Sequence, residues 1–532
     1  MTSWSLDVRA LGRYGLPGFV GSLLLTVGAF GVGWLPLRTG LLDIVYVEAL
    51  RGTPAGQLLS RALVFVGVAL LLQAWLVLGH DLFADQISWN RDDPAHAISL
   101  NPATVSAILA AWCLPLLVSP PLFSRDVYSY YAQGRVMELG QDPYTTGVAD
   151  VPGWFQDGVD PMWGETPTPY GPLFLLVSRG VANFAVDQPA LAALVFRVIA
   201  LVGVVLLAVY VPRLAFLHGI DPGRALWLGV LNPLVVMHFV AGAHNDALMA
   251  GLIAMGLCLA AERRAAWGAA AISLGAAVKP IAFLALPFVG LSWAGLRAGW
   301  GRRIGAWALT ALVAGGVFVA ISIVAGLGWG WIGALTTPGE VRTWLSPATA
   351  LGMLTGGALE WAGLAQDGDS AVTVVRLIGS LLGVAAIAWL VLRPEGRSPT
   401  RGAALAFLAV VVLGPVIQPW YLLWFLPLFA ATGLSPTQLR WTVVLIAGFS
   451  VHAMAESSST QDNLFALSDA LAIVAAFVIV GVVLLVSPRE RRLMIGPALS
   501  HGLLPSTPVD ESRARQAVFQ GPDRPDQGAS RE

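Results

Sequence analysis

Residues Gly414–Phe429 read "GPVIQPWYLLWFLPLF", an apolar segment that contains three prolines and two tryptophans but no charged side chain. A second segment of this kind, "AAVKPIAFLALPF" at Ala276–Phe288, holds two prolines and one lysine. Proline removes a backbone donor and interrupts a helix, so the freed carbonyl groups need partners from neighbouring helices. Both segments therefore predict broken helices packed inside a larger helical bundle.

The whole chain is too apolar for a protein with a water-facing surface. Of its 532 residues 56% are hydrophobic and only 12% are charged, and the mean hydropathy is +0.71. Apolar runs of about 20 residues, the length that crosses a bilayer, recur from Leu16 to Val486. We therefore expect an all-α integral membrane protein with about 13–15 spans. The predicted spans are 16–36, 59–79, 103–121, 186–213, 224–241, 245–262, 266–279, 281–295, 304–327, 371–392, 402–415, 418–432, 439–456 and 466–487.

Arginines gather in alternate loops between these spans, which orients the chain. By the positive-inside rule the arginine-rich loops are cytoplasmic, and the long segment 122–170 falls on the outer face of the plasma membrane. We expect one membrane domain, 1–487, followed by a polar, disordered cytoplasmic tail, 488–532. The arginines that set this orientation are Arg213, Arg224, Arg263, Arg264, Arg297, Arg302, Arg303, Arg393, Arg397, Arg401, Arg489, Arg491 and Arg492.

Several function classes lack support in the sequence. The formal net charge is −1, from 31 basic and 32 acidic residues, so the overall balance does not suggest a nucleic-acid partner. The chain has no phosphate-binding glycine loop, no H-E-x-x-H motif and no cluster of cysteines and histidines with metal-ligand spacing. We therefore expect no cofactor and no metal site, and membrane lipids as the surrounding partner.

The segment "SPPLFSRDVYSYYAQG", Ser119–Gly134, follows a predicted span directly on the outer side. A carboxylate at this depth, Asp126, can act as a general base toward a substrate hydroxyl, with Arg125 and Tyr128 as neighbours in the site. The alternative is that Arg125 and Asp126 end a helix while the tyrosines form an ordinary interfacial belt.

A second polar cluster, "AGAHNDALMA" at Ala241–Ala250, enters the next hairpin on the same side. His244, Asn245 and Asp246 need partners or water there, which favours a binding site. The alternative is that Asn245 or Asp246 caps the helix that follows. Both interpretations can hold, with His244 free to contact an anion or a hydroxyl.

Cations at the outer side could hold a phosphate group. Lys279, the single lysine of the sequence, lies beside a proline break within an apolar segment, and Arg342 lies in an outer loop. The alternatives are a lysine that snorkels to the interface and a solvated loop arginine. Carboxylates, amides and aromatic rings suited to sugar binding complete the set of candidates, although such aromatic residues are also common as membrane anchors: Tyr128, Asp142, Tyr144, Tyr170, Asn245, Asp246, Gln418, Trp420 and Tyr421.

The order of these motifs resembles a known family. "PPLFSRDVYSYYAQGRV", "GQDPY", "YGPL", "AHNDALM", "AAVKPIAFLALPF" and "QPWYLLWFLP" are similar to motifs of the multipass glycosyltransferases with the C-type fold, which take a sugar from a polyprenyl-phosphate donor. The closer resemblance is to the actinobacterial polyprenol-phosphate-mannose-dependent α-1,6-mannosyltransferases that build the backbone of lipomannan and lipoarabinomannan. It extends from about residue 15 to 487. Many members have asparagine where this chain has Asp142.

The resemblance implies a mechanism. Asp126 would deprotonate the 6-hydroxyl of a mannosylated glycolipid acceptor, which displaces polyprenyl phosphate from polyprenyl-phosphate-mannose with inversion. Lys279, Arg342, His244 or Arg125 would hold the donor phosphate. The rival hypotheses are a transporter or flippase of lipid-linked sugars, because broken helices also occur in transporters, and a related transferase that uses another sugar.

Overall fold

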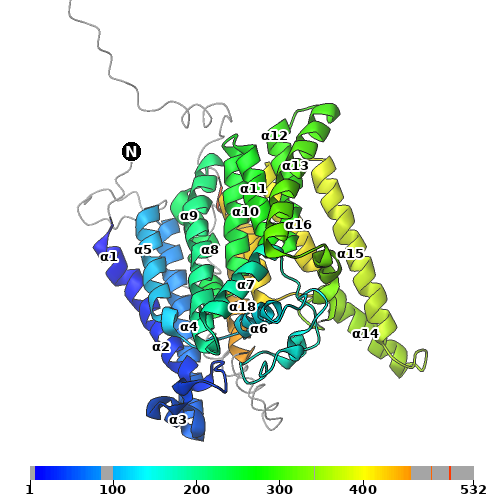
Figure 1. Ribbon diagram of the computed structural model, residues 1–532. Coiled ribbons are helices and arrows are strands. Elements are labelled where there is room, and N and C mark those ends of the chain that lie inside the picture. The colour runs from blue at the N-terminus through cyan, green and yellow to red at the C-terminus, as the bar shows by residue number, and fades with distance from the viewer. Residues whose placement is uncertain (1–5, 85–99, 341, 457–480, 482–501, 505–532) are drawn as a thin grey trace, which may run out of the picture.

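The structure is a computed structural model that describes residues 6–84, 100–340, 342–456, 481 and 502–504. The described residues fold into helices that stand side by side in an upright bundle (Figure 1). Their only β structure is an isolated antiparallel bridge between Leu434 and Leu503. The prediction of an all-α multipass membrane fold is confirmed.

The N-terminal part of the bundle precedes the second polar cluster. It contains α1 (Val8–Ala10), η1 (Leu11–Gly15), α2 (Leu16–Val32), η2 (Gly40–Asp43), α3 (Val45–Gly52), α4 (Pro54–Ala84), α5 (Pro102–Cys113), η4 (Leu114–Val118), α6 (Asp126–Glu138), η5 (Val148–Asp150), η6 (Pro161–Trp163), α7 (Pro172–Phe184), α8 (Pro189–Leu217), α9 (Pro222–Gly229) and η7 (Val235–Ala241).

The C-terminal part begins at that cluster. It contains α10 (Asp246–Ala261), α11 (Ala265–Val278), η8 (Pro280–Ala285), α12 (Leu286–Ala294), α13 (Trp300–Ala325), η9 (Gly330–Glu340), α14 (Pro347–Trp361), α15 (Asp369–Leu392), α16 (Pro399–Leu413), η10 (Pro419–Trp424), α17 (Leu426–Thr432) and α18 (Pro436–Glu456).

Fewer of these helices are full-length spans than the sequence predicts. Among the described residues five helices are long and apolar enough to cross a bilayer, and η7 with α10, bent by 114°, makes a sixth if the bent pair is counted as one span. The predicted spans 103–121, 266–279, 281–295, 402–415 and 418–432 are shorter apolar helices with proline at or near their ends. The predicted span 439–456 forms the 21-residue helix α18, which is not among the membrane-spanning candidates. The predicted span 224–241 is broken between α9 and η7 at Pro233.

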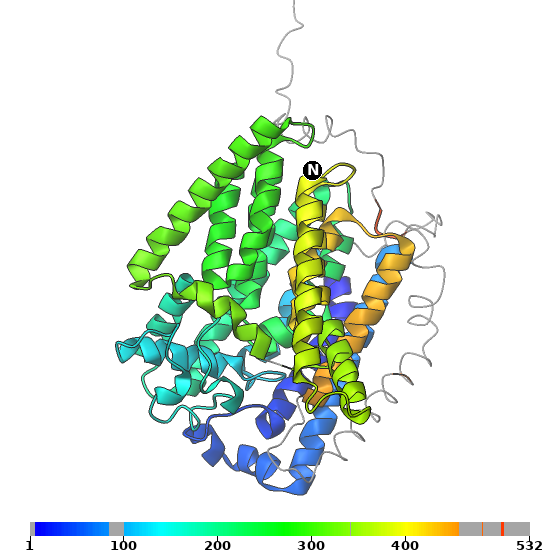
Figure 2. The same cartoon turned by 90° about the vertical axis from the view of Figure 1, so that its right-hand side faces the viewer.

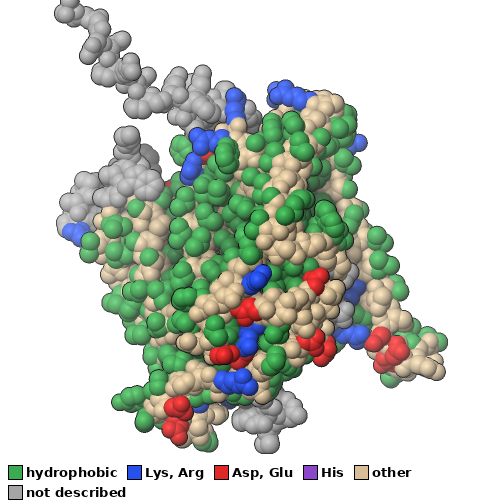
Figure 3. Space-filling view, viewed as in Figure 1, with side chains coloured by type: hydrophobic (Ala, Val, Ile, Leu, Met, Phe, Trp, Pro, Cys, Tyr) green, Lys and Arg blue, Asp and Glu red, His purple; other side chains and the backbone are tan. Residues whose placement is uncertain are grey.

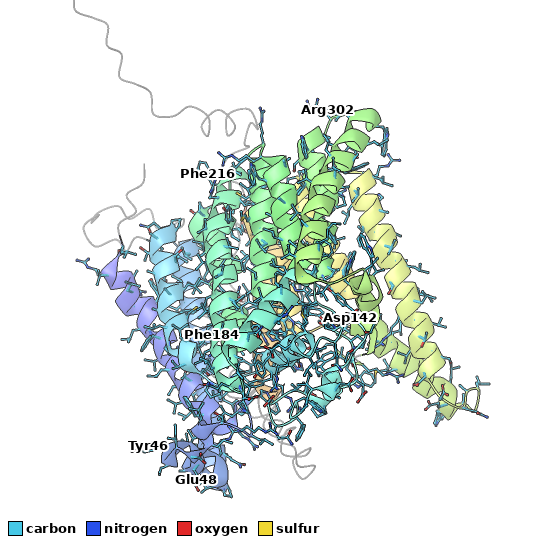
Figure 4. The ribbon with its side chains drawn as sticks, in the orientation of Figure 1. Tyr46, Glu48, Asp142, Phe184, Phe216 and Arg302 are labelled. Atoms are coloured by element: carbon cyan, nitrogen blue, oxygen red, sulfur yellow. The ribbon has the colours of Figure 1, made fainter. Side chains whose placement is uncertain are left out.

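The two ends of the bundle differ in charge, with a broad band of hydrophobic side chains between them (Figure 3). Arg302 lies at one end and Glu48 at the other, with Asp142 in the half of the bundle toward Glu48 (Figure 4). The arginine pattern assigns Arg302 and Asp142 to opposite faces of the membrane. Figure 2 shows the same upright helices from the side.

The helices α8 and α10 approach each other closely through glycine. A Cβ atom at Gly203 would lie 2.2 Å from the backbone of Ala247, and one at Gly251 would lie 2.6 Å from the carbonyl oxygen of Gly203. Small residues let membrane helices pack backbone to backbone. This contact places the first turn of α10, which carries the second polar cluster, against α8.

A groove with a volume of about 900 Å³ opens between α5, α8 and α9. It is lined mainly by apolar side chains and includes Arg213 and Glu262, which form an ion pair at 2.6 Å. None of its lining residues belongs to the polar clusters at Asp126 and His244.

Two predictions fall largely outside the described residues. They are the span 466–487, of which only Gly481 is described, and the tail 488–532, of which only residues 502–504 are described. Within these three residues Leu503 exchanges backbone hydrogen bonds of 2.8 Å with Leu434. The domain boundary at 487 stays a prediction.

Candidate active site

Asp126 is the first residue of α6 and follows an irregular segment that begins at Ser119. In that segment Phe123 adopts a φ of 65°, a conformation that is strained for a bulky residue. The side chain of Asp126 is 19% exposed. Burial raises the pKa of its carboxyl group to about 6, and the Lys279 ammonium group partly offsets this rise. A carboxylate with this pKa is suited to accept a proton near neutral pH.

His244 lies opposite Asp126, in the sharp break between η7 and α10. The residue before it, Ala243, has a φ of 52°, so this turn is strained as well. The His244 Nδ1 atom is 3.6 Å from Asp126 Oδ2, and the imidazole ring stacks on Trp420 at a centroid distance of 3.9 Å. The side chain is completely buried.

Asp246, two residues after His244 in the sequence, supplies a second carboxylate to the site. Both of its oxygens accept hydrogen bonds from Lys279 Nζ, at 2.9 and 3.1 Å, and Oδ1 also accepts one from Trp424 Nε1 at 2.7 Å. Lys279 is the residue that ends α11, directly before Pro280. The proline breaks recognised in the sequence thus bring α10, α11 and η10 together at one ion pair.

Aromatic rings surround the ammonium group of Lys279. The Nζ atom lies 5.9 Å from the centroid of Tyr170 and 5.3 Å from the centroids of Tyr421 and Trp424. Tyr421 and Trp424 stack on each other at 4.0 Å. The side chain of Lys279 is 12% exposed, so the residue is not completely enclosed. These cation–π contacts add to the ion pair with Asp246, so the ammonium group is held from several sides at one place in the site.

A buried arginine ties both strained turns to α8. The Arg197 guanidinium group donates to the carbonyl oxygens of Leu117 at 3.1 Å, Val240 at 2.9 Å and Ala241 at 3.2 Å. Leu117 precedes the Asp126 segment, and Val240 and Ala241 precede the His244 turn. Arginine suits this position because its rigid fork satisfies several acceptors at once.

The structure gathers about half of the predicted site residues into one cluster. Asp126, His244, Asp246, Lys279, Tyr170, Trp420 and Tyr421 are joined by the contacts given above. Tyr144 belongs to the wall of this site, because its hydroxyl group donates to the carbonyl oxygen of Tyr170 at 3.0 Å. Gln418 precedes η10 and is partly buried, with no cap hydrogen bond to that helix.

Asn245 occupies the position before α10, but its side chain makes no capping hydrogen bond. Both polar atoms of its amide group are buried and have no hydrogen-bond partner among the described residues. The helix-cap alternative therefore does not account for this side chain.

The remaining candidates have other partners. Arg125 Nε bonds Asp160 at 3.1 Å and its guanidinium group lies over Trp34, whose carbonyl oxygen accepts a bond from the Tyr128 hydroxyl. Asp142 is exposed and accepts from the backbone N–H of Tyr144 at 2.9 Å.

Arg342 pairs with Asp369 at 2.7 Å, and both side chains are at least half exposed. The described contacts of Arg342 thus do not join it to Asp126, while Lys279 lies within the cluster. A role for any of these residues in phosphate binding stays a prediction.

Sequence reasoning missed Trp424, although the quoted motif contains it. The reason is local geometry: η10 is a 3₁₀ helix, in which residues three apart lie on the same face. Tyr421 and Trp424 therefore stack and both face Lys279. An α-helix would also place residues three apart on one face. What the sequence did not show is that this face meets Lys279, which follows α11.

The described residues contain no group of three or more His, Cys, Asp or Glu side chains that could hold a metal ion. The expectation that the reaction needs no metal stays a prediction.

Comparison with known proteins identifies relatives over most of the chain. Residues 15–295 match the family model described as alpha-(1->6)-mannopyranosyltransferase, N-terminal domain, and residues 348–486 match the MptB C-terminal domain. The alpha-(1->6)-mannopyranosyltransferase A of Mycobacterium tuberculosis is 35% identical over 82% of this chain and 83% of its own. The protein of that name from Corynebacterium glutamicum is 32% identical over 80% of this chain and 89% of its own. No solved structure matches.

Proposed function

Because the chain belongs to the alpha-(1->6)-mannopyranosyltransferase family, we propose that it transfers mannose from polyprenyl-phosphate-mannose to the 6-hydroxyl of a mannoside acceptor. It is a multipass membrane mannosyltransferase, which requires a sugar donor and a glycan acceptor. The acceptor in this proposal is a mannosylated glycolipid of the growing lipomannan and lipoarabinomannan backbone.

The observation that carries the proposal is the pairing of a base with a caged cation in one site. Asp126 has a raised pKa and is in electrostatic reach of Lys279, whose ammonium group is surrounded by Tyr170, Tyr421 and Trp424. Glycosyl transfer from a lipid phosphate needs both functions: a base for the acceptor hydroxyl and a positive charge for the departing phosphate.

The reaction follows from these two groups. The carboxylate of Asp126 takes the proton of the acceptor 6-hydroxyl while O6 forms a bond to the anomeric carbon of mannose. The bond from that carbon to the phosphate oxygen breaks, and its electron pair leaves with polyprenyl phosphate. Attack from the face opposite the leaving group converts a β-linked donor into an α-linked product. Lys279, aligned by Asp246, stabilises the charge that develops on the phosphate.

The proposed setting is the outer face of the plasma membrane, where a lipid-linked donor and a glycolipid acceptor both reach the site along the bilayer. Asp142 and α6 lie in the half of the bundle away from Arg302 (Figures 1 and 4), which supports this orientation by the positive-inside rule. A transporter or flippase has no comparable support, because the relatives carry the name of an enzyme.

The base is tested by Asp126→Asn, which keeps the shape of the side chain but cannot accept the proton. Transfer from synthetic polyprenyl-phosphate-mannose to an α-mannoside acceptor is measured in membranes with matched protein levels. We expect a loss of about 10²–10⁴-fold, the usual contribution of a general base. The control is Asp150→Asn, an exposed carboxylate of the same loop. Full transfer by Asp126→Asn, or no transfer by the unmodified protein with this donor, contradicts the proposal.

A further inference from the structure

His244 has a relation to Asp126 that the donor-phosphate role does not explain. Its Nδ1 atom faces Asp126 Oδ2 at 3.6 Å, and this carboxylate is the only ionisable partner of its ring within ion-pair distance in the described part of the chain. Neither ring nitrogen has a hydrogen-bond partner among the described residues, although the side chain is completely buried. A buried polar group without a partner is costly, so its retention calls for a function.

The imidazole ring is held in one orientation from three sides. Trp420 stacks on one face at 3.9 Å with the rings inclined by 25°. A Cβ atom at position 242 would lie 3.0 Å from Cδ2 and 3.2 Å from Nε2 of His244, so only Gly242 leaves space for the ring. The strained φ of 52° at Ala243 fixes the backbone beside it. A histidine that only binds the donor phosphate would not need a ring held so firmly.

The phosphate role is also better filled by another residue. The Lys279 side chain is 12% exposed and its ammonium group contacts aromatic rings such as Trp424. The His244 ring is completely buried, stacks on Trp420 and faces Asp126. We propose, on the basis of the function proposed above, that His244 is the positioning residue of the base Asp126, with its Nδ1–H directed at carboxylate oxygen Oδ2.

This arrangement assigns different tasks to the two carboxylate oxygens. In the structure His244 Nδ1 and Asp126 Oδ2 are 3.6 Å apart, beyond hydrogen-bond distance. In the proposed reaction the pair closes on the bound substrates, and a neutral imidazole with its proton on Nδ1 then donates to Oδ2 and keeps Oδ1 directed at the acceptor hydroxyl. A donor aimed at a carboxylate also favours its ionised form. Loss of the His244 donor therefore makes Asp126 harder to ionise and leaves it free to rotate, while the donor phosphate site around Lys279 is unchanged.

The other ionisable groups near Asp126 come from several elements and stay in place when His244 is substituted. They include Lys279 at the end of α11, Asp246 on α10 and Asp160 before η6. The remaining groups in electrostatic reach are Tyr130 on α6, Tyr170 before α7 and Tyr421 on η10.

The test compares three variants in the transfer assay with polyprenyl-phosphate-mannose and an α-mannoside. His244→Phe keeps the stacked ring without a donor, and His244→Asn places an amide N–H near the position of Nδ1. His238→Phe is the matched control. His238 is an equally buried histidine whose ring lies 6.1 Å from the His244 ring and also packs near Trp420, but it forms no ion pair with Asp126 in the described part of the chain. The readouts are kcat, the KM of each substrate and the acidic limb of the pH profile of kcat/KM.

We expect His244→Phe to lower kcat by about 10–100-fold, with the donor KM within about threefold of its original value. The acidic limb moves to higher pH, and His244→Asn returns it toward its original position. If His244→Phe raises the donor KM and leaves the acidic limb of the pH profile in place, the inference is overturned and His244 is a phosphate-binding residue. If His238→Phe has an equal effect, the role of His244 is only to pack against its neighbours, and the inference is also overturned. Failure of the proposed function is distinct from both, because the unmodified protein would then not use this donor.

Discussion

At the scale of single residues, the charge state of Asp126 links burial to activity. The pKa of a carboxyl group rises when the group is buried, because the charged form loses hydration. For Asp126 this effect exceeds the opposing attraction of Lys279 and brings the pKa to about 6. The base is therefore protonated over a range of mildly acidic pH in which an exposed aspartate stays ionised.

The first consequence is a pH dependence of sugar transfer. Since only the ionised carboxylate accepts a proton, kcat/KM is expected to fall below a pH of about 6 and to decrease about tenfold per pH unit further down. Initial rates measured between pH 5 and 8 in one buffer series give this limb. The control Asp150→Asn should show the same acidic limb. If the midpoint of the limb lies near the pKa of an exposed aspartate, a group other than Asp126 controls it.

The ion pair between Asp246 and Lys279 predicts a distinction between folding and function. Lys279→Met leaves the carboxylate of Asp246 buried without its counter-charge, so it should lower the free energy of unfolding by about 3–5 kcal/mol. The double variant Asp246→Asn, Lys279→Met removes both charges and should recover much of this loss. Thermal unfolding in detergent measures the recovery.

The same double variant separates the two roles of Lys279. If its ammonium group binds the donor phosphate, the double variant remains deficient in donor use after its stability returns. The donor KM should then stay raised by about tenfold or more, the effect of one lost charge-assisted contact. A normal donor KM in a stable double variant leaves Lys279 with a structural role only.

At the scale of elements, the site depends on turns that stand where helices break. The broken pair η7 and α10 carries His244 and Asp246, while the segment between η4 and α6 leads to Asp126. Arg197 of α8 bonds the carbonyl groups on both sides and so fixes their separation. A change at this arginine should therefore affect catalysis as well as stability.

Arg197→Lys tests that link. The lysine ammonium group is compact and cannot span the three carbonyl groups, so about 3 kcal/mol of unfolding free energy should be lost and transfer should fall about tenfold or more. Arg213→Lys is the control, because Arg213 lies on the same helix with a half-exposed side chain. Arg197 would be no more than a structural residue if Arg197→Lys unfolded earlier yet kept the transfer rate and its pH profile.

The proline breaks also explain which parts of the site were predictable. Asp126, His244 and Asp246 interrupt apolar segments, and such residues are visible in any apolar sequence. Their partners were not visible, because contact between Lys279 and Trp424 depends on how α10 packs against both α11 and η10. Likewise the apolar length of 224–241 predicted a span, whereas Pro233 divides it into two pieces.

At the scale of the whole molecule, the charge difference between the two ends of the bundle makes the orientation testable. Arg302 and Asp142 are both exposed, with Arg302 at one end of the bundle and Asp142 in the half toward the other end (Figure 4). The positive-inside rule assigns the end with Arg302 to the cytoplasm, so the half of the bundle with Asp142 faces outward. The active site, which contains α6, lies in the half of the bundle toward α3 (Figure 1).

Cysteine labelling resolves this orientation with little background, because Cys113 and Cys258 are both buried. Single variants Asp142→Cys and Arg302→Cys are treated in intact cells with a membrane-impermeant maleimide. Asp142→Cys should react at once, whereas Arg302→Cys should react only after the membrane is opened, since its thiol faces the cytoplasm. The unmodified chain is the control for the native cysteines. Reversed labelling would place the site on the cytoplasmic face, where a donor with its phosphate at the outer surface could not reach Lys279.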